Sequence, residues 1–233
     1  MAVFYGKPGD QTFKGKDATF DTYYSNATGA VTIDLNLTIG TVKGESEVGI
    51  DSLISIEAAH GGQGADTITG NGKANDLYGH AGNDTINGGG GNDDLYGGDG
   101  DDTLDGGEGD DDLFGGTGGD KLLGGAGNDD LYGDAGDDFL TGGGGRDFLI
   151  GGAGADIMDG GLGADVFFFG SRSGSDQINV FNFGEGDRLN LQGQTYSLSE
   201  SVPGDDVILT LSGGGIIELN GISKELFSND FIA

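Results

Sequence analysis

A nine-residue pattern of glycine, acidic and apolar positions repeats twelve times without a gap from residue 61 to residue 168. The first position is always Gly, the fourth is Gly except at Lys73, the sixth is Asp except at Asn75, and the eighth is always apolar. A fixed short period is typical of a solenoid, in which each repeat packs only on its neighbours. We therefore predict an all-β solenoid of about six coils, with two repeats in each coil.

Each repeat is predicted to contain a turn and a very short strand. Gly at the first, second and fourth places permits a positive φ, which costs other residues about 1 kcal/mol or more. The first six residues should therefore form the turn, and the last three, such as 85–87, the strand. The middle residue of each strand points inward. These eighth positions predict a thin core of Ile68, Leu77, Ile86, Leu95, Leu104, Leu113, Leu122, Leu131, Leu140, Leu149, Met158 and Phe167.

The sixth positions recur every eighteen residues on the same side of the solenoid and so form two ladders. One ladder contains Asp66, Asp84, Asp102, Asp120, Asp138 and Asp156, and the other contains Asn75, Asp93, Asp111, Asp129, Asp147 and Asp165. Coils lie about 4.8 Å apart, so adjacent carboxylates repel each other strongly in a partly dehydrated setting. The chain has 10 Lys and Arg against 40 Asp and Glu. A cation from solution is therefore expected, and oxygen ligands of this kind select Ca²⁺.

The pattern resembles the repeats-in-toxin (RTX) nonapeptides over residues 61 to 168. That resemblance implies a parallel β-roll of about six coils. It also implies Ca²⁺ between turns of neighbouring coils, held by the eleven ladder aspartates and by backbone carbonyls. The carbonyls belong to the first and third residues of one turn and the second and fourth of its neighbour. In one gap these turns comprise Gly88, Gly89, Gly90, Gly91, Gly106, Gly107, Glu108 and Gly109. Five gaps on each side give up to about ten ions; the Asn75 gap is the weakest, because Asn is neutral and Lys73 is near.

Without metal, an acidic and glycine-rich tract is expected to be disordered. A formal charge of −30 on 233 residues opposes compaction. Metal binding and folding should therefore be one event, a transition from disorder to order. Asp176, outside the repeats, is expected to matter far less to this event than Asp111 in the middle of a ladder.

Composition and termini bear on the compartment. The chain has no Cys, its N-terminus lacks the apolar stretch of a signal peptide, and no apolar run has the length of a membrane span. The RTX resemblance implies a bacterial substrate of the type I secretion machinery, exported unfolded by an uncleaved C-terminal signal and folded by external calcium. We therefore expect an extracellular protein.

Three regions are predicted. Residues 1–60 form an N-terminal β cap, 61–168 the calcium-binding β-roll, and 169–233 a C-terminal β module with the export signal. Within the last region, 207–211 and 216–219 read as a β-hairpin and 223–227 as one helical turn, and 229–233 resembles the signal. Apolar seventh positions in the late coils, such as Phe139 and Phe148, predict that the C-terminal module packs back on them.

An outward stripe of Tyr78, Tyr96, Phe114 and Tyr132 has two interpretations. The rings stack to stabilise the sheet or lie under a cap or a second copy, or they form a platform for sugar rings beside the carboxylates of Asp76, Asp94, Asp112 and Asp130. The chain has no basic patch, which argues against nucleic acid.

Enzyme motifs are missing: no HExxH and no GxSxG occurs. His60 and His80 are expected to be turn residues rather than a catalytic pair. The sequence therefore predicts a secreted, non-catalytic calcium-binding protein. A glycan-binding adhesin of a cell surface, an accessory module of a polysaccharide-modifying enzyme and a free effector protein remain alternatives.

Overall fold

The structure is a computed structural model that describes residues 57–171, 173–200, 206–222 and 232, together with strands at 3–5, 12–14, 22–24, 31–34, 40–44 and 51–54. Every regular element in these residues is a β-strand. No helix capable of crossing a membrane is found among them. The prediction of an all-β chain is confirmed.

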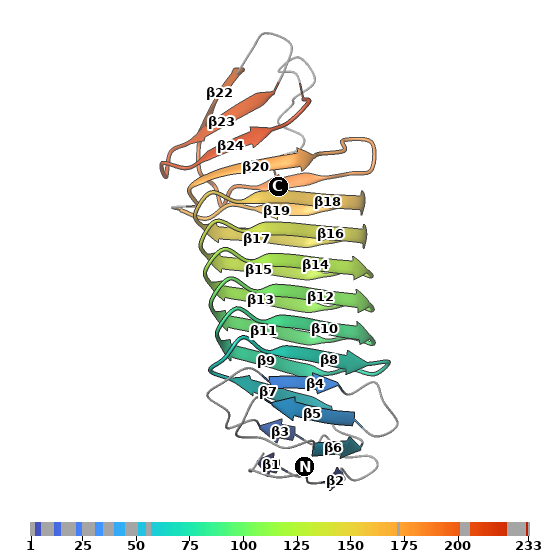
Figure 1. Cartoon of the computed structure of the whole chain (residues 1–233). Coiled ribbons are helices and arrows are strands. Elements are labelled where there is room, and N and C mark those ends of the chain that lie inside the picture. The colour runs from blue at the N-terminus through green and yellow to red at the C-terminus, as the bar shows by residue number, and fades with distance from the viewer. Residues whose placement is uncertain are drawn as a thin grey trace.

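The strands form two sheets that face each other along a solenoid (Figure 1). The first sheet contains, in spatial order, β1 (Val3–Tyr5), β3 (Thr22–Tyr24), β7 (Ala58–Gly62), β9 (Asp76–Ala81), β11 (Asp94–Asp99), β13 (Asp112–Thr117), β15 (Asp130–Ala135), β17 (Phe148–Ala153), β19 (Val166–Phe168) and β21 (Arg188–Asn190). The second contains β2 (Thr12–Lys14), β6 (Asp51–Ile54), β5 (Gly40–Gly44), β4 (Val31–Asp34), β8 (Thr67–Asn71), β10 (Thr85–Gly90), β12 (Thr103–Glu108), β14 (Lys121–Ala126), β16 (Phe139–Gly145), β18 (Ile157–Gly163), β20 (Ser175–Val180), β24 (Ile216–Leu219), β23 (Val207–Leu211) and β22 (Tyr196–Glu200).

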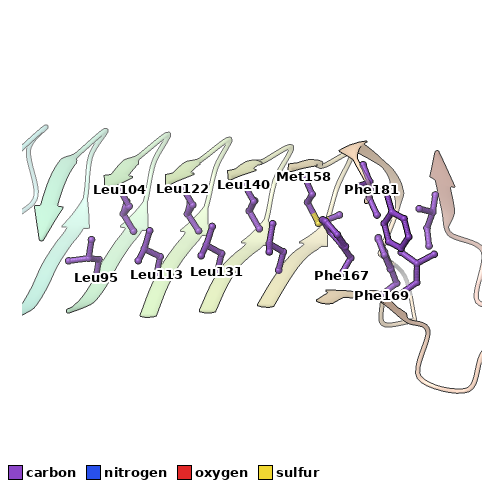
Figure 2. Packing of buried hydrophobic residues seen from close by; sticks show 14 of the residues in the cluster. Leu95, Leu104, Leu113, Leu122, Leu131, Leu140, Met158, Phe167, Phe169 and Phe181 are labelled. Carbon is purple, nitrogen blue, oxygen red and sulfur yellow. The ribbon is translucent and has the colours of Figure 1, made fainter. Parts of the chain in front are cut away.

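The repeats pair in parallel with an offset of eighteen residues. Ile86 lies beside Leu104, and Leu104 lies beside Leu122. This register stacks the eighth positions of alternate repeats, and each of these side chains is at most 2% exposed. Figure 2 shows the two rows meeting between the sheets, ending at Phe167, Phe169 and Phe181. The parallel β-roll and its thin core are confirmed.

The strands are longer than the sequence predicts, and the turns are shorter. Strand β12 begins at the seventh residue of one repeat, Thr103, and continues through the third residue of the next, Glu108. Glycine makes this continuation feasible: at Gly107, φ is 107° and an added Cβ would collide with the carbonyl oxygen of Gly89 in the preceding coil. Only residues four to six form the turn, so the prediction of a six-residue turn is wrong.

The roll architecture extends beyond the repeats at both ends. Strand β4 pairs in parallel with β8 and places Ile33 beside Ile68 in the core. Strands β20 and β21 pair in parallel with β18 and β19. The predicted hairpin is present as antiparallel β23 and β24. The predicted helical turn at 223–227 and most of the 229–233 segment lie outside the described residues.

The C-terminal strands extend the second sheet instead of packing back on the late coils. Strand β24 pairs with β20, and β23 and β22 follow it outward (Figure 1). Phe139 remains 54% exposed. Among the described strands the expected cover over the late coils is therefore not found, because the free edge of β20 offers them a ladder of backbone hydrogen bonds.

Candidate metal centre

The sixth-position side chains form two buried acidic ladders along the edges of the roll. The eleven repeat aspartates and Asn75 are each at most 2% exposed. They lie at the end of the short turn, one residue before each strand begins, so every coil places one such residue on each side. A charged side chain at this depth requires a partner, because burial disfavours an unpaired charge.

One oxygen of each carboxylate has a defined role. The backbone N–H of Asp93 donates to Oδ1 of Asp111 at 2.8 Å, and the N–H of Asp111 donates to Oδ1 of Asp129 at 2.9 Å. The same bond links successive coils in the other ladder, for example from Asp102 to Asp120 at 2.7 Å. These hydrogen bonds fix the carboxylate orientation and tie each coil to the next.

The second oxygen, Oδ2, has no hydrogen-bond partner in most of the ladder carboxylates. In the described part of the chain, Oδ2 is buried and has no hydrogen-bond partner at Asp84, Asp93, Asp102, Asp111, Asp120, Asp129, Asp138, Asp147, Asp156 and Asp165. Buried polar atoms are rarely left unpaired in native proteins. The repetition of this arrangement along both ladders indicates that something outside the chain satisfies these oxygens.

The first-position glycines leave room for that partner. A Cβ added at Gly106 would lie 2.5 Å from Oδ2 of Asp111 and 2.6 Å from the carbonyl oxygen of Gly124. The carboxylate oxygen of one coil and a carbonyl oxygen of the next therefore converge above the bare Cα of this glycine. Any larger residue would fill the space.

The eight backbone residues predicted for one gap lie on adjacent coils. Gly88, Gly89 and Gly90 lie in β10 and Gly91 in the turn after it, while Gly106, Gly107 and Glu108 lie in β12 and Gly109 in the turn after it. The carbonyl oxygen of Gly106 faces the space over Gly88 that Oδ2 of Asp93 also borders. The Glu108 carbonyl accepts a 2.7 Å hydrogen bond from the Gly91 N–H. Of the predicted carbonyls, the structure thus places that of Gly106 beside the Asp93 carboxylate.

The pKa values of the ladder carboxyl groups also indicate that each site needs a positive charge. Burial raises the pKa of Asp93, Asp102, Asp129 and Asp138 to about 7, and the backbone hydrogen bond to each carboxylate opposes the shift without cancelling it. The carboxylate of the next coil in the ladder adds repulsion, as Asp147 does for Asp129. A proton or a cation must offset the charge of each site.

The donor set fits a hard cation. No group of three or more Asp, Glu, His or Cys side chains suited to a metal lies within the described residues. The ladder therefore offers two carboxylates per gap, and backbone carbonyls must complete any coordination shell. Carboxylate and carbonyl oxygens around an ion that accepts six to eight ligands are the preference of Ca²⁺.

Asn75 satisfies its own polar atoms. Its Oδ1 accepts from the Asn71 N–H at 2.9 Å, and its Nδ2 donates to the Glu57 carbonyl at 3.1 Å. The Nζ atom of Lys73 lies 3.8 Å from Oε1 of Glu57. Asn75 therefore offers neither a carboxylate nor an unpaired oxygen. The gap between Asn75 and Asp93 lacks, on the Asn75 side, the buried unpaired carboxylate oxygen that the ladder aspartates from Asp84 to Asp165 supply.

Two further aspartates continue the ladders beyond the repeats. Asp156 N–H donates to Oδ1 of Asp176 at 3.2 Å, and Asp165 N–H donates to Oδ1 of Asp187 at 3.0 Å. Both side chains are at most 2% exposed. Asp176 lies outside the repeats, as the sequence indicates, but in space it continues one of the two ladders. The sequence does contain a signal for this position, the order Gly-x-Asp-x-apolar at Gly174–Ile178. Inserted residues place Asp176 twenty positions after Asp156, so an eighteen-residue period does not reveal it.

The aromatic stripe is a stack of rings along the roll axis. Tyr78 and Tyr96 have ring centroids 4.6 Å apart at an interplanar angle of 2°, Tyr96 and Phe114 are 4.9 Å apart at 4°, and Phe114 and Tyr132 are 4.8 Å apart at 6°. Each ring covers the faces of its neighbours. A sugar needs an open ring face for stacking, so this geometry favours the interpretation that the stack stabilises the sheet.

The stack has a member that the sequence analysis missed. His60 in β7 lies 4.3 Å from Tyr78 at an interplanar angle of 2°. Its Nδ1 is 2.8 Å from Nε2 of His80 in β9. Burial and the neighbouring His80 lower the pKa of His60 to about 4. Both histidines lie in strands, so their prediction as turn residues is wrong.

Comparisons with known proteins agree with the repeat geometry. Residues 60–95, 87–122, 105–140, 114–149 and 132–167 match a family described as RTX calcium-binding nonapeptide repeat (4 copies). No curated protein matches the chain.

Two solved structures show partial similarity. One is the crystal structure of the extracellular lipase LipA from Serratia marcescens, with 18% identity, 93% of this chain and 40% of the lipase covered, and a TM-score of 0.42. The other is the solution structure of the AlgE6R3 subunit from the Azotobacter vinelandii mannuronan C5-epimerase, with 32% identity, 53% of this chain and 77% of that subunit covered, and a TM-score of 0.30. This chain spans less than half of the length of the lipase.

Proposed function

Residues 60–167 are RTX calcium-binding nonapeptide repeats, and from this premise we propose that calcium is the folding trigger of the whole chain. The single observation that carries the proposal is the row of buried carboxylate oxygens, from Asp84 to Asp165, that have no hydrogen-bond partner. Folding leaves these oxygens buried and unpaired, whereas water hydrates them in the unfolded chain. A metal-free roll must therefore protonate its ladder carboxylates or bear their repulsion.

The chain's own residues prepare each site. Oδ1 of Asp129 accepts the N–H of Asp111, which turns Oδ2 toward the gap between coils. The first-position glycines bring a carbonyl oxygen of the next coil into the same space. Calcium supplies the positive charge that lets both carboxylates of a gap remain ionised. The ligands come from adjacent coils, so binding and coil stacking stabilise each other.

The number of ions follows from the ladders. Five gaps lie between the six sixth-position residues on each side of the repeats, and up to about ten ions would fill them. Asn75 offers neither a charge nor an unpaired oxygen, which lowers the expected number by one. Equilibrium dialysis against radioactive calcium tests this count: nine or ten ions per chain support the proposal, and two or fewer would contradict it.

We further infer that folding takes place outside the cell. A chain of charge −30 that remains expanded without calcium suits a type I exporter, which passes unfolded substrates. Extracellular calcium, about 10⁻³ M, fills weak sites that are empty in the cytosol. Cells that carry such an exporter should release the full chain into the medium, and deletion of residues 229–233 should retain it inside. Equal release of both forms would contradict the export signal.

The proposal assigns no catalytic step to the chain. A calcium-dependent glycan-binding role, as an adhesin or as an accessory module of a polysaccharide-modifying enzyme, would have to use the ring edges of Tyr78, Tyr96 and Tyr132 with the flanking carboxylates. Retention on immobilised neutral and acidic polysaccharides, with and without calcium, decides this role. Retention that disappears in Tyr96→Ala would support it.

A further inference from the structure

The acidic ladder crosses from the repeats into the C-terminal module at Asp156 and Asp176. The Asp156 N–H donates to Oδ1 of Asp176 at 3.2 Å, which is the bond that links every coil of the roll. The two residues are twenty positions apart rather than eighteen, and both are at most 2% exposed. The two carboxyl groups are in direct contact with each other.

A buried side-chain hydroxyl also lies at this position. Ser173 is 4% exposed, and its Oγ is buried without a hydrogen-bond partner. This hydroxyl lies near the Asp176 carboxyl group, three residues further along the chain. A Cβ added at Gly215 in the following hairpin would lie 2.8 Å from Ser173 Oγ and 3.2 Å from the Gly174 carbonyl oxygen. The Ser173 hydroxyl and the Asp176 carboxyl group thus lie buried in one short segment, and Asp156, whose Oδ2 is also buried and unpaired, lies on the adjoining coil.

We propose that Asp156, Asp176 and Ser173 hold a further Ca²⁺ at the junction of the roll and the C-terminal module, and that this ion fastens the C-terminal sheet to the roll. The inference rests on the proposed calcium chemistry of the ladders. It adds a ligand set of two carboxylates and a hydroxyl, and two of these three residues lie beyond the matched repeats. The hydroxyl suits calcium, because hard neutral oxygens complete its coordination.

The fastening role follows from the strand pairing. Strand β20, which begins at Ser175, pairs with β18 of the roll on one edge and with β24 on the other. Asp176 lies beside Ile217 of β24, and the Ile216 N–H donates to the Gly174 carbonyl at 2.8 Å. The segment 173–176 therefore provides both the oxygens of the site and the first backbone contacts of β24. Repulsion between Asp156 and Asp176 would displace this segment and release β24 and β23.

A shared proton is the competing explanation. One proton between Asp156 and Asp176 would also relieve their repulsion, and it would leave Ser173 without a role. The substitution Asp176→Asn separates the two explanations, because an amide reproduces the neutral protonated acid but weakens a cation site. Ser173→Ala removes only the hydroxyl. Ser175→Ala is the matched control, since Ser175 is exposed and lies between the two site residues.

The experiment uses the full chain with calcium. Native mass spectrometry counts bound ions, and hydrogen exchange compares residues 207–219 of the C-terminal hairpin with residues 85–105 of the roll. Asp176→Asn should bind one ion fewer and lose protection at 207–219 by about ten-fold. Protection at 85–105 should not change. Ser173→Ala should raise the calcium concentration that protects 207–219 several-fold, and Ser175→Ala should behave as the wild type.

Three results would overturn the proposal. A full ion count with unchanged protection in Asp176→Asn would mean that a proton bridges the pair. Lost protection at 207–219 without loss of an ion would mean that Asp176 acts only through its hydrogen bonds. A wild-type chain that binds no calcium would contradict the proposed function itself, whereas the first two results leave calcium binding by the repeats intact. If Asp176→Asn does not fold, equal calcium dependence of 207–219 in Ser173→Ala and Ser175→Ala contradicts the site.

Discussion

The backbone N–H of Asp111 donates a 2.9 Å hydrogen bond to Oδ1 of Asp129, while Oδ2 of Asp129 is buried without a hydrogen-bond partner. The two oxygens of one carboxylate therefore have different roles. The first links adjacent coils and orients the side chain, and the second is available to a cation. Substitutions that affect only one of the two oxygens separate these roles.

Replacing Asp111 by Asn keeps an acceptor for the Asp93 N–H but puts an amide N–H₂ in place of the unpaired oxygen. Since Asp111 borders two gaps in the middle of its ladder, the calcium midpoint of folding should rise by about ten-fold or more, equivalent to about 1.4 kcal/mol. Asp112→Asn makes the same change of charge at the next residue, which is exposed. Calcium titrations followed by circular dichroism compare the two, and equal shifts would mean that the ladder is not the binding site.

Adding a methyl group at Gly106 tests the space in which the oxygens converge. The new Cβ would lie 2.5 Å from Asp111 Oδ2 and 2.6 Å from the Gly124 carbonyl oxygen. Gly106→Ala should therefore abolish the adjoining site and raise the calcium midpoint. A Cβ at Gly144 meets nothing within 4 Å. Gly144→Ala is the control, and its unfolding free energy should change by about 0.5 kcal/mol or less. Tolerance of both substitutions would contradict a converging oxygen site.

Calcium affinity should depend on pH between about 5 and 8. Because burial raises the pKa of Asp93, Asp102, Asp129 and Asp138 from 3.8 to about 7, the compact metal-free roll binds more protons than the unfolded chain in this range. The stability of the metal-free roll is greatest below pH 3.8 and falls as pH rises from there to about 7. Protons compete with calcium for the same oxygens, so the calcium midpoint should decrease as pH rises from 5.5 to 8.

Salt separates this effect from general repulsion between charges. A molar concentration of NaCl screens exposed charges but acts less on buried ones. The pH dependence of the calcium midpoint should therefore persist in high salt. A midpoint that does not change with pH would contradict competition between protons and calcium at the ladder.

The aromatic stack predicts a stability effect that depends on the ring and not on the hydroxyl. Tyr96 stacks between Tyr78 and Phe114 at 4.6 and 4.9 Å. Tyr96→Ala removes two ring pairs and should destabilise the calcium-bound form by about 1–3 kcal/mol, whereas Tyr96→Phe should have little effect. Denaturant unfolding in excess calcium measures both. A large loss in Tyr96→Phe would assign the role to the hydroxyl group instead.

The sequence predicts the fold most accurately where its period is strict. The eighteen-residue spacing from Leu95 to Leu113 reproduces the register of the strands, because parallel coils of equal length must place equivalent residues side by side. The same spacing locates Asp111 and Asp129 in one ladder. At Asp176 and Asp187 the period lengthens to twenty and twenty-two residues, so the ladder continues in space while its sequence signal disappears.

Other features depend on tertiary contacts that no period encodes. His60 joins the ring stack because β7 pairs with β9, and His60 itself lies just before the first repeat. The exposure of Phe139 depends on where the C-terminal strands attach, and they attach to the edge of β20. A local pattern of apolar residues indicates a surface that could be covered but not whether anything covers it.

The central claim is that calcium folds the roll. Calcium is titrated into metal-free protein while far-ultraviolet circular dichroism and hydrodynamic radius are recorded, with magnesium as the control. We predict an expanded chain in chelator that collapses cooperatively to β structure near 10⁻³ M calcium and does not respond to equal magnesium. A chain that is already compact and rich in β structure in chelator at neutral pH would contradict the claim.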